Sequence, residues 1–334
     1  MSTKDQIIKI LEESQGAVIS GETLAQSIGV SRAAVWKSIS ELRKEGFIID
    51  AATNNGYSLS PSSDVISIPG ILNHCTGSPI NGEQLHLFKT LDSTNLTAKK
   101  MALDGAPHGT IVISEQQTAG RGRMGRDFFS PASSGIYMSM LLKPTFDTSR
   151  AVLITTAASV AVSRAIEATT GFRVQIKWVN DLYLKGKKIC GILTEGVTNF
   201  ETNHIDSIVL GIGINFRAPE TAFPEELAEI AGALFTHDSS DCTRNQLIGN
   251  IITEMFSMIE TLEDRQFIQE YKERSLVLGK EINVIKGGEL FPATALDIDL
   301  DGGLVVNYKN DNPGESQIAT LNSGEISIRL LPKQ

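Results

Sequence analysis

The segment GRGRMGR, residues 120–126, places three arginines and three glycines within seven positions. Glycine lets a backbone bend closely around a ligand, and each guanidinium offers a planar fork of donors that suits a phosphate or a carboxylate. A merely solvated loop is a poor interpretation of Arg121, Arg123 and Arg126, because like charges so close together repel one another until an anion neutralises them. The segment has no GxxxxGK[ST] Walker pattern, and no helix pattern follows it as in a dinucleotide fingerprint. We therefore expect this arginine loop to clamp an anion.

Two phenylalanines follow the arginine loop directly. Phe128 and Phe129 can close over the apolar part of a ligand or stack on a base, and either can instead belong to the core. Upstream of the loop, DSTN at residues 92–95 has the composition of a helix N-cap. The same residues gather hydroxyls and an amide at a helix N-terminus, where anions and polar groups are held. Both interpretations of DSTN stay open from the sequence.

The segment KWVND, residues 177–181, brings a cation, an amide and a carboxylate to the end of a strand pattern, where catalytic residues often gather. A structural explanation also exists, since Asn and Asp favour turns and Trp178 is most often a core residue. Lys188 precedes the apolar pattern ICGIL, where a partly desolvated ammonium can bind a phosphate or a carboxylate. Cys190 is better explained as a small core residue than as a nucleophile, because no histidine lies close in sequence.

The composition is that of an ordinary globular protein of 334 residues with 41% hydrophobic content, long enough for two or three domains. The net charge of −9 excludes an extended basic surface, so any contact with nucleic acid must depend on a local charge. Cys75, Cys190 and Cys242 lie far apart without CxxC spacing, and the five histidines have no metal-ligand spacing. No apolar segment approaches the roughly twenty residues of a membrane span. These features predict a cytoplasmic protein without disulfides, a protein-bound metal or membrane contact.

Helix patterns and a hairpin pattern occupy the first sixty residues. The first helix is expected to start at Thr3, with Gln6 reaching back in a capping box. Two short helices follow, separated by a glycine turn and capped at Ser31, and they form a helix-turn-helix unit. Strand patterns at 47–49 and 57–59 add a small hairpin, so the unit is predicted to be winged. The apolar stripes of the three helices contain Ile7, Ile10 and Leu11, then Leu24 and Ile28, then Val35, Ile39 and Leu42.

One face of the second short helix is a candidate DNA-binding surface. Residues 31–44 carry four basic side chains against a single acid, and the polar positions fall opposite the apolar stripe, where phosphates and base edges would be met. Helix-turn-helix geometry also occurs in proteins that bind no DNA, and Asn54 and Asn55 give the wing no charge. We favour DNA binding. The predicted contact residues are Arg32, Ala33, Trp36, Lys37, Ser40 and Lys44.

The Ser/Pro-rich segment SPSSDVISIPG, residues 60–70, is expected to link the helix-turn-helix unit to the rest of the chain. Strand and helix patterns then mix without strict alternation, which predicts an α+β fold with a mixed sheet rather than a doubly wound parallel one. The final fifty or so residues alternate between Gly/Asp turns and predict a small β-barrel. The expected domains are 1–62, 63–278 and 279–334. The predicted central strands are 85–88, 110–114, 136–142, 174–178, 189–194 and 207–214, and the predicted helices are 149–169 and 245–262.

Together these motifs make the chain resemble the bifunctional biotin protein ligases that double as biotin operon repressors. GRGRMGR is similar to the family's GRGRxGR loop, KWVND to its KWPND, KKICGIL to its K-x-x-GIL strand, GIGIN to its G-x-G-x-N, and GEISIR to its C-terminal segment. The resemblance extends over essentially the whole chain. Met124 stands where a fourth arginine is frequent, Val179 replaces the proline, and Phe128 sits where tryptophan is common.

The resemblance implies a reaction in two steps. The carboxylate of biotin would attack the α-phosphate of ATP to give biotinyl-5′-AMP and pyrophosphate, and a lysine of a biotin carboxyl carrier protein domain would then attack this mixed anhydride. The first nucleophile is already an anion, so no Ser/His/Asp arrangement is needed. Preorganised donors are what such a transfer requires, together with Mg²⁺ shared by the phosphates.

The resemblance also assigns roles to individual residues. Ser93, Thr94 and Gln117 would bind the ureido or carboxyl end of biotin, and Gly191 would leave room for its bicycle. The implied catalytic residues are Arg123, Lys188 and Asp181. The implied biotin-binding residues are Ser93, Thr94, Asn95, Gln117, Arg121, Gly122, Arg123, Lys188 and Gly191. The implied ATP- or adenylate-binding residues are Arg121, Arg123, Arg126, Phe128, Lys177, Asn180 and Asn215.

At the level of the whole protein, the resemblance implies a winged helix-turn-helix, a central sheet of the biotin/lipoate ligase type and a C-terminal SH3-like β-barrel. The arginine loop would be mobile when empty and would order over the adenylate, which shields the anhydride from water. The adenylate-bound protein would form a homodimer through a sheet edge. This dimer would bind operator DNA and repress biotin biosynthesis or uptake genes.

Two other classes of function have to be distinguished from this one. A transcription factor that merely senses a small acid would share the helix-turn-helix, but the intact arginine loop and Lys188 favour retained chemistry. A lipoate ligase has a related architecture but lacks the GRGRxGR pattern and the N-terminal winged helix. Transfer of labelled biotin to a carrier domain in the presence of MgATP separates the enzyme from the sensor.

Overall fold

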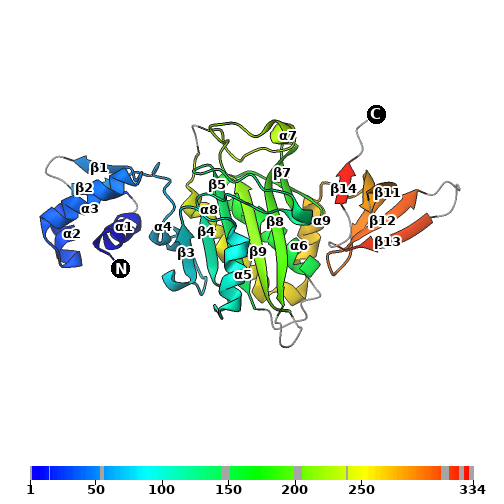
Figure 1. Ribbon diagram of the computed structural model, residues 1–334, viewed down its shortest axis with the longest axis horizontal. Helices are drawn as coiled ribbons and strands as arrows, with labels where there is room; N and C mark the ends of the chain where they lie inside the picture. Colours follow the sequence, from blue (N-terminus) through cyan, green and yellow to red (C-terminus); the bar gives the residue numbers. More distant parts are fainter. Residues whose placement is uncertain are drawn as a thin grey trace.

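The computed structural model describes residues 2–14, 16–52, 56–143, 151–198, 205–237, 240–286, 288–309, 316–322 and 327–330. A helix-rich N-terminal unit, a central mixed sheet flanked by helices, and a C-terminal antiparallel sheet lie side by side along the long axis (Figure 1). The predicted α+β architecture is confirmed in this outline.

The N-terminal unit contains the predicted helix-turn-helix. Gly29 adopts the left-handed conformation with φ 76°, and the Ser31 hydroxyl accepts a hydrogen bond from the backbone N–H of Ala34, as its capping role requires. The apolar stripes meet in one core, in which Ile7, Leu24 and Ile39 are fully buried. The elements are α1 (Thr3–Glu13), α2 (Gly21–Ile28), α3 (Arg32–Lys44), β1 (Ile49–Ala52) and β2 (Gly56–Leu59).

Two local predictions for this unit are wrong. The cap of α1 is Ser2 and not Thr3, and its capping-box partner is Asp5 and not Gln6, because Ser2 has the extended backbone that a cap needs while Thr3 is already helical. The first hairpin strand begins at Ile49, since Phe47 still closes the end of α3 through a hydrogen bond to Leu42. The predicted wing residues Asn54 and Asn55 lie outside the described residues.

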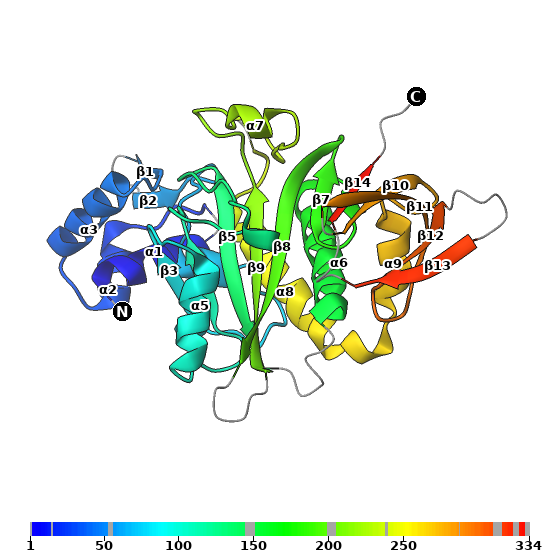
Figure 2. The ribbon, with the colours of Figure 1, turned by 45° about the vertical axis from the view of Figure 1, so that its right-hand side comes forward.

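The central sheet has the strand order β3-β4-β5-β9-β8-β7-β6, with β3 and β4 parallel and the other neighbours antiparallel. Helix α5 (Thr94–Leu103) covers one face of the sheet. The other face is covered by α6 (Ala151–Thr170), α8 (Arg244–Glu260) and α9 (Phe267–Arg274) (Figures 1 and 2). Every predicted central strand is present, the strand at 85–88 with its predicted ends and the other five with shifted ends, which confirms the mixed sheet. The strands are β3 (Leu85–Phe88), β4 (Ile111–Ser114), β5 (Gly135–Leu142), β6 (Gln175–Lys177), β7 (Asp181–Leu184), β8 (Lys187–Thr198) and β9 (Ile205–Asn215).

The helices of the central unit include the two that the sequence predicted and several shorter ones that it did not. Contrary to the expectation from the sequence that no apolar segment approaches this length, residues 152–170 of α6 are long and apolar enough to cross a membrane. Because 72% of the most apolar stretch is buried inside the structure, α6 is explained as a core helix. The helices are α4 (Ile68–Leu72), α5 (Thr94–Leu103), α6 (Ala151–Thr170), α7 (Glu225–Ala228), α8 (Arg244–Glu260) and α9 (Phe267–Arg274).

The C-terminal unit is an antiparallel sheet with the order β13-β12-β11-β10-β14. Its alternating pattern buries Ile282, Val284 and Val306 against the central core. Among the described residues no pairing joins β13 to β14, so the structure confirms the antiparallel β-sheet, and its closure into a barrel stays a prediction. The strands are β10 (Glu281–Lys286), β11 (Glu289–Ile298), β12 (Leu304–Lys309), β13 (Ser316–Leu321) and β14 (Ser327–Leu330).

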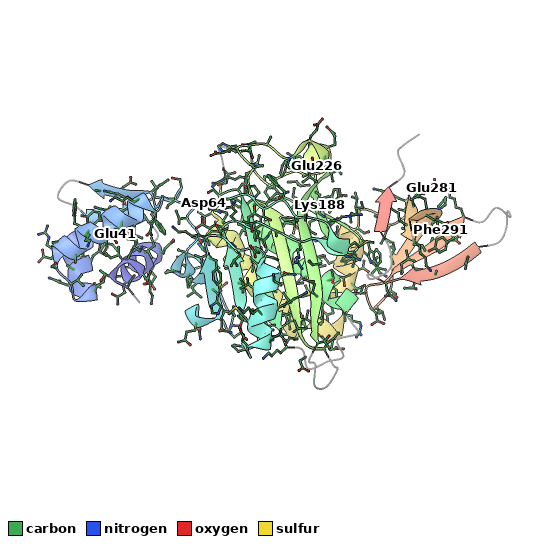
Figure 3. The ribbon with its side chains drawn as sticks, viewed as in Figure 1. Glu41, Asp64, Lys188, Glu226, Glu281 and Phe291 are labelled. Atoms are coloured by element: carbon green, nitrogen blue, oxygen red, sulfur yellow. The ribbon has the colours of Figure 1, made fainter. Side chains whose placement is uncertain are left out.

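The linker that follows the N-terminal unit is fastened to the central unit at Asp64, which lies between the two (Figure 3). Its carboxylate accepts hydrogen bonds from the backbone N–H of Arg244 at 2.6 Å and from the guanidinium Nε of Arg244 at 3.0 Å. Arg217 Nη1 approaches the same carboxylate at 3.1 Å. The side chains of Asp64 and Arg244 are 8% and 5% exposed, so this is a buried ion pair at the start of the linker.

Asp64→Ala should destabilise the protein strongly. It leaves the Arg244 guanidinium buried without its carboxylate, which costs about 3 kcal/mol or more. The urea midpoint of the full chain should therefore fall. Asp50→Ala removes an exposed carboxylate from β1 and serves as the matched control. Equal midpoints for the two variants would contradict the assignment of Asp64 as a structural anchor.

Candidate active site

A cavity of about 890 Å³ opens on the central sheet, where β7 and β8 lie between the ends of β6 and β9. The arginine loop forms one wall, β7 and β8 form the floor, and the segment around α7 forms the opposite wall. Figure 2 shows α7 beyond the end of β9, and Figure 3 places Lys188 below the segment that carries Glu226. The predicted site residues that line the cavity are Arg121, Gly122, Arg123, Arg126, Phe128, Lys177, Asn180, Asp181, Lys188, Gly191 and Asn215.

The arginine loop is a short backbone hairpin at the mouth of this cavity. Phe128 N–H donates to Gly120 O at 2.9 Å, and Gly122 N–H donates to Arg126 O at 2.7 Å. A Cβ at Gly120 would lie 2.5 Å from Phe128 O, so the closure of this loop depends on glycine at that position. Met124 and Gly125 turn the tip with positive φ values of 57° and 71°. The loop therefore holds its guanidinium groups at a cavity, and its function as an anion clamp stays a prediction.

Arg123 is the guanidinium that the loop directs inward. Its Nη1 donates to Asn180 Oδ1 at 3.2 Å, and it is less exposed than Arg121 and Arg126. Burial lowers the pKa of Arg123, while the nearby Asp181 carboxylate raises it and Arg126 lowers it further. A guanidinium stays charged at physiological pH despite such a shift. A buried cation in this setting favours an anionic ligand that restores the solvation it has lost.

Lys188 and Asp181 form an ion pair on the cavity floor. Lys188 Nζ lies 2.7 Å from Asp181 Oδ1, and the two side chains are 30% and 23% exposed. A Cβ at Gly191 would lie 3.4 Å from both Lys188 Nζ and the ring of Phe128, so glycine keeps this floor open. The structure therefore brings together the three residues predicted to be catalytic, Arg123, Lys188 and Asp181, around one cavity.

Phe128 lines the cavity with a half-buried ring and does not stand at its exposed rim. A Cβ on Gly213 would come within 2.6 Å of its ring, so the ring packs directly on the backbone of β9. It also meets Tyr137 edge-on, with ring centroids 6.4 Å apart. The aromatic ring that was predicted to cover a nucleotide thus stands over Gly191, the place predicted to accommodate the biotin bicycle.

The residues at the start of α5 lie behind the cavity and do not line it. Ser93 caps the helix, and Thr94 donates through both its N–H and its hydroxyl to Gln117 Oε1, at 2.9 and 3.2 Å. Gln117 Nε2 donates in turn to Ser130 Oγ at 2.9 Å. Ser93 and Thr94 are 3% and 4% exposed. The structure therefore supports the N-cap interpretation of DSTN and ties Gln117 to the base of the arginine loop.

Asn95, predicted to bind biotin, faces away from the cavity. Its Nδ2 donates to Glu195 Oε2 at 2.8 Å, and its Oδ1 accepts from Ser139 Oγ at 2.6 Å. A Cβ on Gly211 would collide with the Asn95 amide at 2.1 Å, so this glycine makes room for the amide. Asn95 is therefore placed to join α5 to the sheet.

The polar groups predicted for the nucleotide come from both sides of the β8–β7 floor, since Asn215 ends β9 and Lys177 ends β6. Asn180 Nδ2 donates to Ile192 O at 2.7 Å, which leaves its Oδ1 to accept from Arg123. Lys177 Nζ lies 5.8 Å from the centroid of the Tyr183 ring, in cation–π geometry. Asn215 Nδ2 donates to Gly232 O at 2.8 Å and is thereby tied to the α7 segment.

The sequence reasoning missed the apolar wall around α7. Phe223 meets Phe129 with ring centroids 6.3 Å apart, which joins this wall to the arginine loop. Backbone hydrogen bonds from Lys188 N–H to Ile230 O and from Gly232 N–H to Lys188 O, both 2.8 Å, fasten it to the floor. Its sequence has no strong periodicity, so only the spacing of its apolar side chains could have indicated it. These are Phe223, Leu227, Ile230 and Ala231.

Cys190 belongs to the β8 floor of the cavity but is fully buried, and burial raises the pKa of its thiol strongly. A thiol that resists deprotonation is a poor nucleophile, so the structure favours its core role. Burial and the Asp181 carboxylate raise the pKa of Tyr183 to about 12, which keeps that phenol neutral. In the described parts of the chain, no group of three or more His, Cys, Asp or Glu side chains could hold a metal ion.

The predicted DNA-contact residues lie on the outer face of α3. Arg32, Ala33, Lys37 and Lys44 are exposed, and Trp36 is 65% exposed. An indole so exposed on a helix is unusual for a monomeric surface. Ser40 is half-buried, and its hydroxyl donates to the backbone carbonyl of the helix turn before it at 2.9 Å.

Comparison with known proteins gives three matching regions. Residues 87–215 match the biotin/lipoate A/B protein ligase family, residues 3–58 an HTH domain, and residues 277–329 the C-terminal domain of biotin protein ligases. The chain is 37% identical to a bifunctional ligase/repressor BirA of Bacillus spizizenii over 75% of its own length and 76% of that protein. It is 27% identical to the Escherichia coli bifunctional ligase/repressor BirA over 95% of both chains. It is also similar in structure to an Aquifex aeolicus biotin protein ligase in complex with biotin and ATP, with a TM-score of 0.59, 25% identity, and coverage of 74% of this chain and 99% of that one.

Proposed function

This chain belongs to the family of bifunctional biotin protein ligases and biotin repressors, and on that premise we propose that it joins biotin to a carrier protein at the expense of ATP and represses transcription in response to biotin. The observation that carries the ligase proposal is the convergence of Arg123, Lys188 and Asp181 on one cavity bordered by the arginine loop. That cavity offers guanidinium and ammonium donors to an anion and apolar walls to the rest of the ligand.

In the first step, a carboxylate oxygen of biotin attacks the α-phosphorus of ATP, and the bond to the pyrophosphate oxygen breaks with its electron pair. Negative charge builds up on the α-phosphate oxygens, where fixed cations give most stabilisation. We assign this role to Lys188 and Arg123. We assign four residues to the nucleotide: Lys177, Asn180, Arg126 and Asn215. Arg121, Gly122 and Gly191 are assigned to biotin. Thr94 and Gln117 act on biotin through the base of the arginine loop, which they support, and Ser93 acts by capping α5.

In the second step, the amine of a lysine on the biotin carboxyl carrier protein attacks the acyl carbon, and AMP leaves with the electron pair of the broken C–O bond. The attacking ammonium must first lose a proton. The Asp181 carboxylate, exposed by 23% on the cavity floor, is placed to receive it when ligands separate it from Lys188.

The donors in the cavity fit a magnesium ion that arrives with the nucleotide. Asp127 and Asp181 are the carboxylates among its described lining residues, and Mg²⁺ typically takes one or two carboxylates together with substrate phosphates. When bound, the ion would neutralise charge on the phosphates. Asp181 is the residue that we expect to approach it.

The ligase proposal is tested with purified protein, labelled biotin, MgATP and a biotin carboxyl carrier protein domain. Labelled carrier is the expected product, and biotinyl-5′-AMP should accumulate when the carrier is left out. Binding of biotin without any transfer of label would instead support a transcription factor that senses a small acid.

For the repressor role, we propose that the α3 face binds operator DNA of biotin biosynthesis or uptake genes and that the adenylate-bound protein is a homodimer. On β8, residues 193–198 pair with β9 but with no described strand on their other side, since β7 pairs only with the first part of β8. Such an edge can pair with a second copy of itself. Sedimentation with and without biotin and ATP measures this association.

We further propose that the protein is located in the cytoplasm and that its domains comprise residues 1–62, 63–278 and 279–334.

Arg32→Ala should weaken operator binding about tenfold, as expected for the loss of one charge-assisted contact to DNA, and should lower the salt slope by about one. Binding is measured with a duplex selected from random DNA by the adenylate-bound protein. Biotin transfer to the carrier should be unchanged, because α3 lies far from β7, β8 and α7 (Figure 1), which carry lining residues of the cavity. Equal loss of transfer and DNA binding would point to a folding defect and count against the assignment.

A further inference from the structure

The segment that carries Asn180 and Asp181 is tied to the C-terminal sheet. Trp178 Nε1–H donates to Gly302 O at 2.9 Å, in the turn between β11 and β12. Trp178 is only 5% exposed, so the hydrogen bond is made in a largely dry environment. Gly302 has φ 85°, and a Cβ there would lie 2.8 Å from Thr156 Oγ1. The turn thus packs between α6 and the indole, and the carbonyl of Gly302 accepts the hydrogen bond from the indole N–H.

This β11–β12 turn, residues 299–303, is internally rigid. The Asp299 carboxylate accepts hydrogen bonds from the backbone N–H groups of Asp301 at 2.9 Å and Gly303 at 2.7 Å. Asp299 N–H donates to Gly303 O at 2.9 Å, which closes the turn. Arg265 Nε donates to Leu300 O at 3.0 Å and fixes the outside of the turn to the central unit. A turn held in this way presents its carbonyl at a defined position.

The neighbouring residue is held from the central unit. Val179 O accepts from the hydroxyls of Tyr271 at 3.1 Å and Ser159 at 3.3 Å. Asn180 is fixed in turn by its hydrogen bonds to Ile192 and Arg123. The segment that delivers an amide and a carboxylate to the cavity is therefore clamped between two units, and one of its anchors belongs to the C-terminal sheet.

We propose that the β11–β12 turn is a positioning element for adenylation, which acts through Trp178 to set the place of Asn180 and Asp181. This inference rests on the proposed function, in which these side chains face the nucleotide. Small displacements of groups that orient a reacting substrate weaken catalysis strongly. Loosening the turn should therefore reduce the affinity for ATP while biotin, bound mainly at the arginine loop and Lys188, is held as before.

Asp299→Ala tests this without touching the cavity, because Asp299 is not among its lining residues. We expect the KM for ATP in adenylate formation to rise about tenfold, as for the loss of one to two kcal/mol of binding, with the Kd for biotin alone unchanged. Asp301→Ala is the control within the same turn. Its side chain is 71% exposed and pairs with Arg265 Nη2 at 3.1 Å, but it accepts none of the hydrogen bonds to Asp299 that close the turn, and the bond from Arg265 to Leu300 O does not involve it. It should keep the KM of the unaltered protein.

Trp178→Phe removes the indole N–H that bonds to Gly302 and keeps an aromatic ring at this position, which also lines the cavity. This variant carries the test if Asp299→Ala does not fold. An unchanged KM for ATP in a folded variant, or an equal loss of affinity for biotin, would overturn the proposal. So would the same rise in Asp301→Ala. If the unaltered protein makes no adenylate at all, the proposed function itself fails, and that outcome is seen before the variants are compared.

Discussion

Lys188→Ala should slow the formation of biotinyl-5′-AMP by about 10²- to 10³-fold, the effect typical of removing one preorganised donor to a developing oxyanion. The ammonium is the fixed cation on the cavity floor, 2.7 Å from Asp181. Its removal takes away charge that the transition state needs and leaves Asp181 to repel both the biotin carboxylate and the phosphates. The loss should appear in kcat more than in the KM for ATP, because the charge on the phosphates grows as the reaction proceeds.

The measurement is pyrophosphate release in a single turnover without carrier protein. Lys185→Ala is the control, since Lys185 is exposed in the hairpin between β7 and β8 and does not line the cavity. Both variants remove one positive charge from the same hairpin, so a general electrostatic effect would slow both. A loss in Lys188→Ala no larger than that of the control would remove Lys188 from the catalytic residues.

Arg123→Ala should release the adenylate about ten- to a hundredfold faster, as expected for the loss of a charge-assisted hydrogen bond. Arg123 is the partly buried guanidinium of the arginine loop, and burial lowers its pKa. This cost of desolvation is offset when the phosphate of the adenylate arrives. Its present bond to Asn180 also fastens the loop to the floor, so the variant loses both the contact and the closure.

Adenylate release is followed by trapping labelled biotinyl-5′-AMP after dilution into unlabelled ligand. Arg173→Ala removes an exposed arginine of the same unit that is absent from the cavity lining, and it should release the adenylate at the original rate. An unchanged rate in Arg123→Ala would show that the arginine loop does not retain the intermediate. Its function as a clamp would then have to be abandoned.

The two variants separate the two functions assigned to the cavity. Lys188 acts on the charge that develops during transfer, whereas Arg123 holds the product of that transfer. A protein that only senses biotin would need the second function and not the first. A large loss of rate in Lys188→Ala together with near-normal binding of biotin would therefore favour the enzyme over the sensor.

The sequence alone determined what is local. The glycine turn and Ser31 cap of the helix-turn-helix, the alternation of the strands, and the concentration of charge in the arginine loop all depend on neighbours within a few residues. Such features are recorded in the spacing of residue types, so they can be recognised from the order of the amino acids. The same holds for Lys188, which stands directly before the apolar pattern ICGIL.

Only the tertiary structure decided which of these groups meet. Asn95 has the residue type and motif of a ligand-binding group, yet its amide is turned toward Glu195, 100 positions away. Trp178 finds its acceptor at Gly302, 124 positions away, and Arg244 finds Asp64 at a separation of 180. The α7 wall reaches the cavity because backbone bonds pin it to Lys188. Contacts of this kind are fixed by the packing of whole layers against one another, and packing leaves no period in the chain from which they could be inferred.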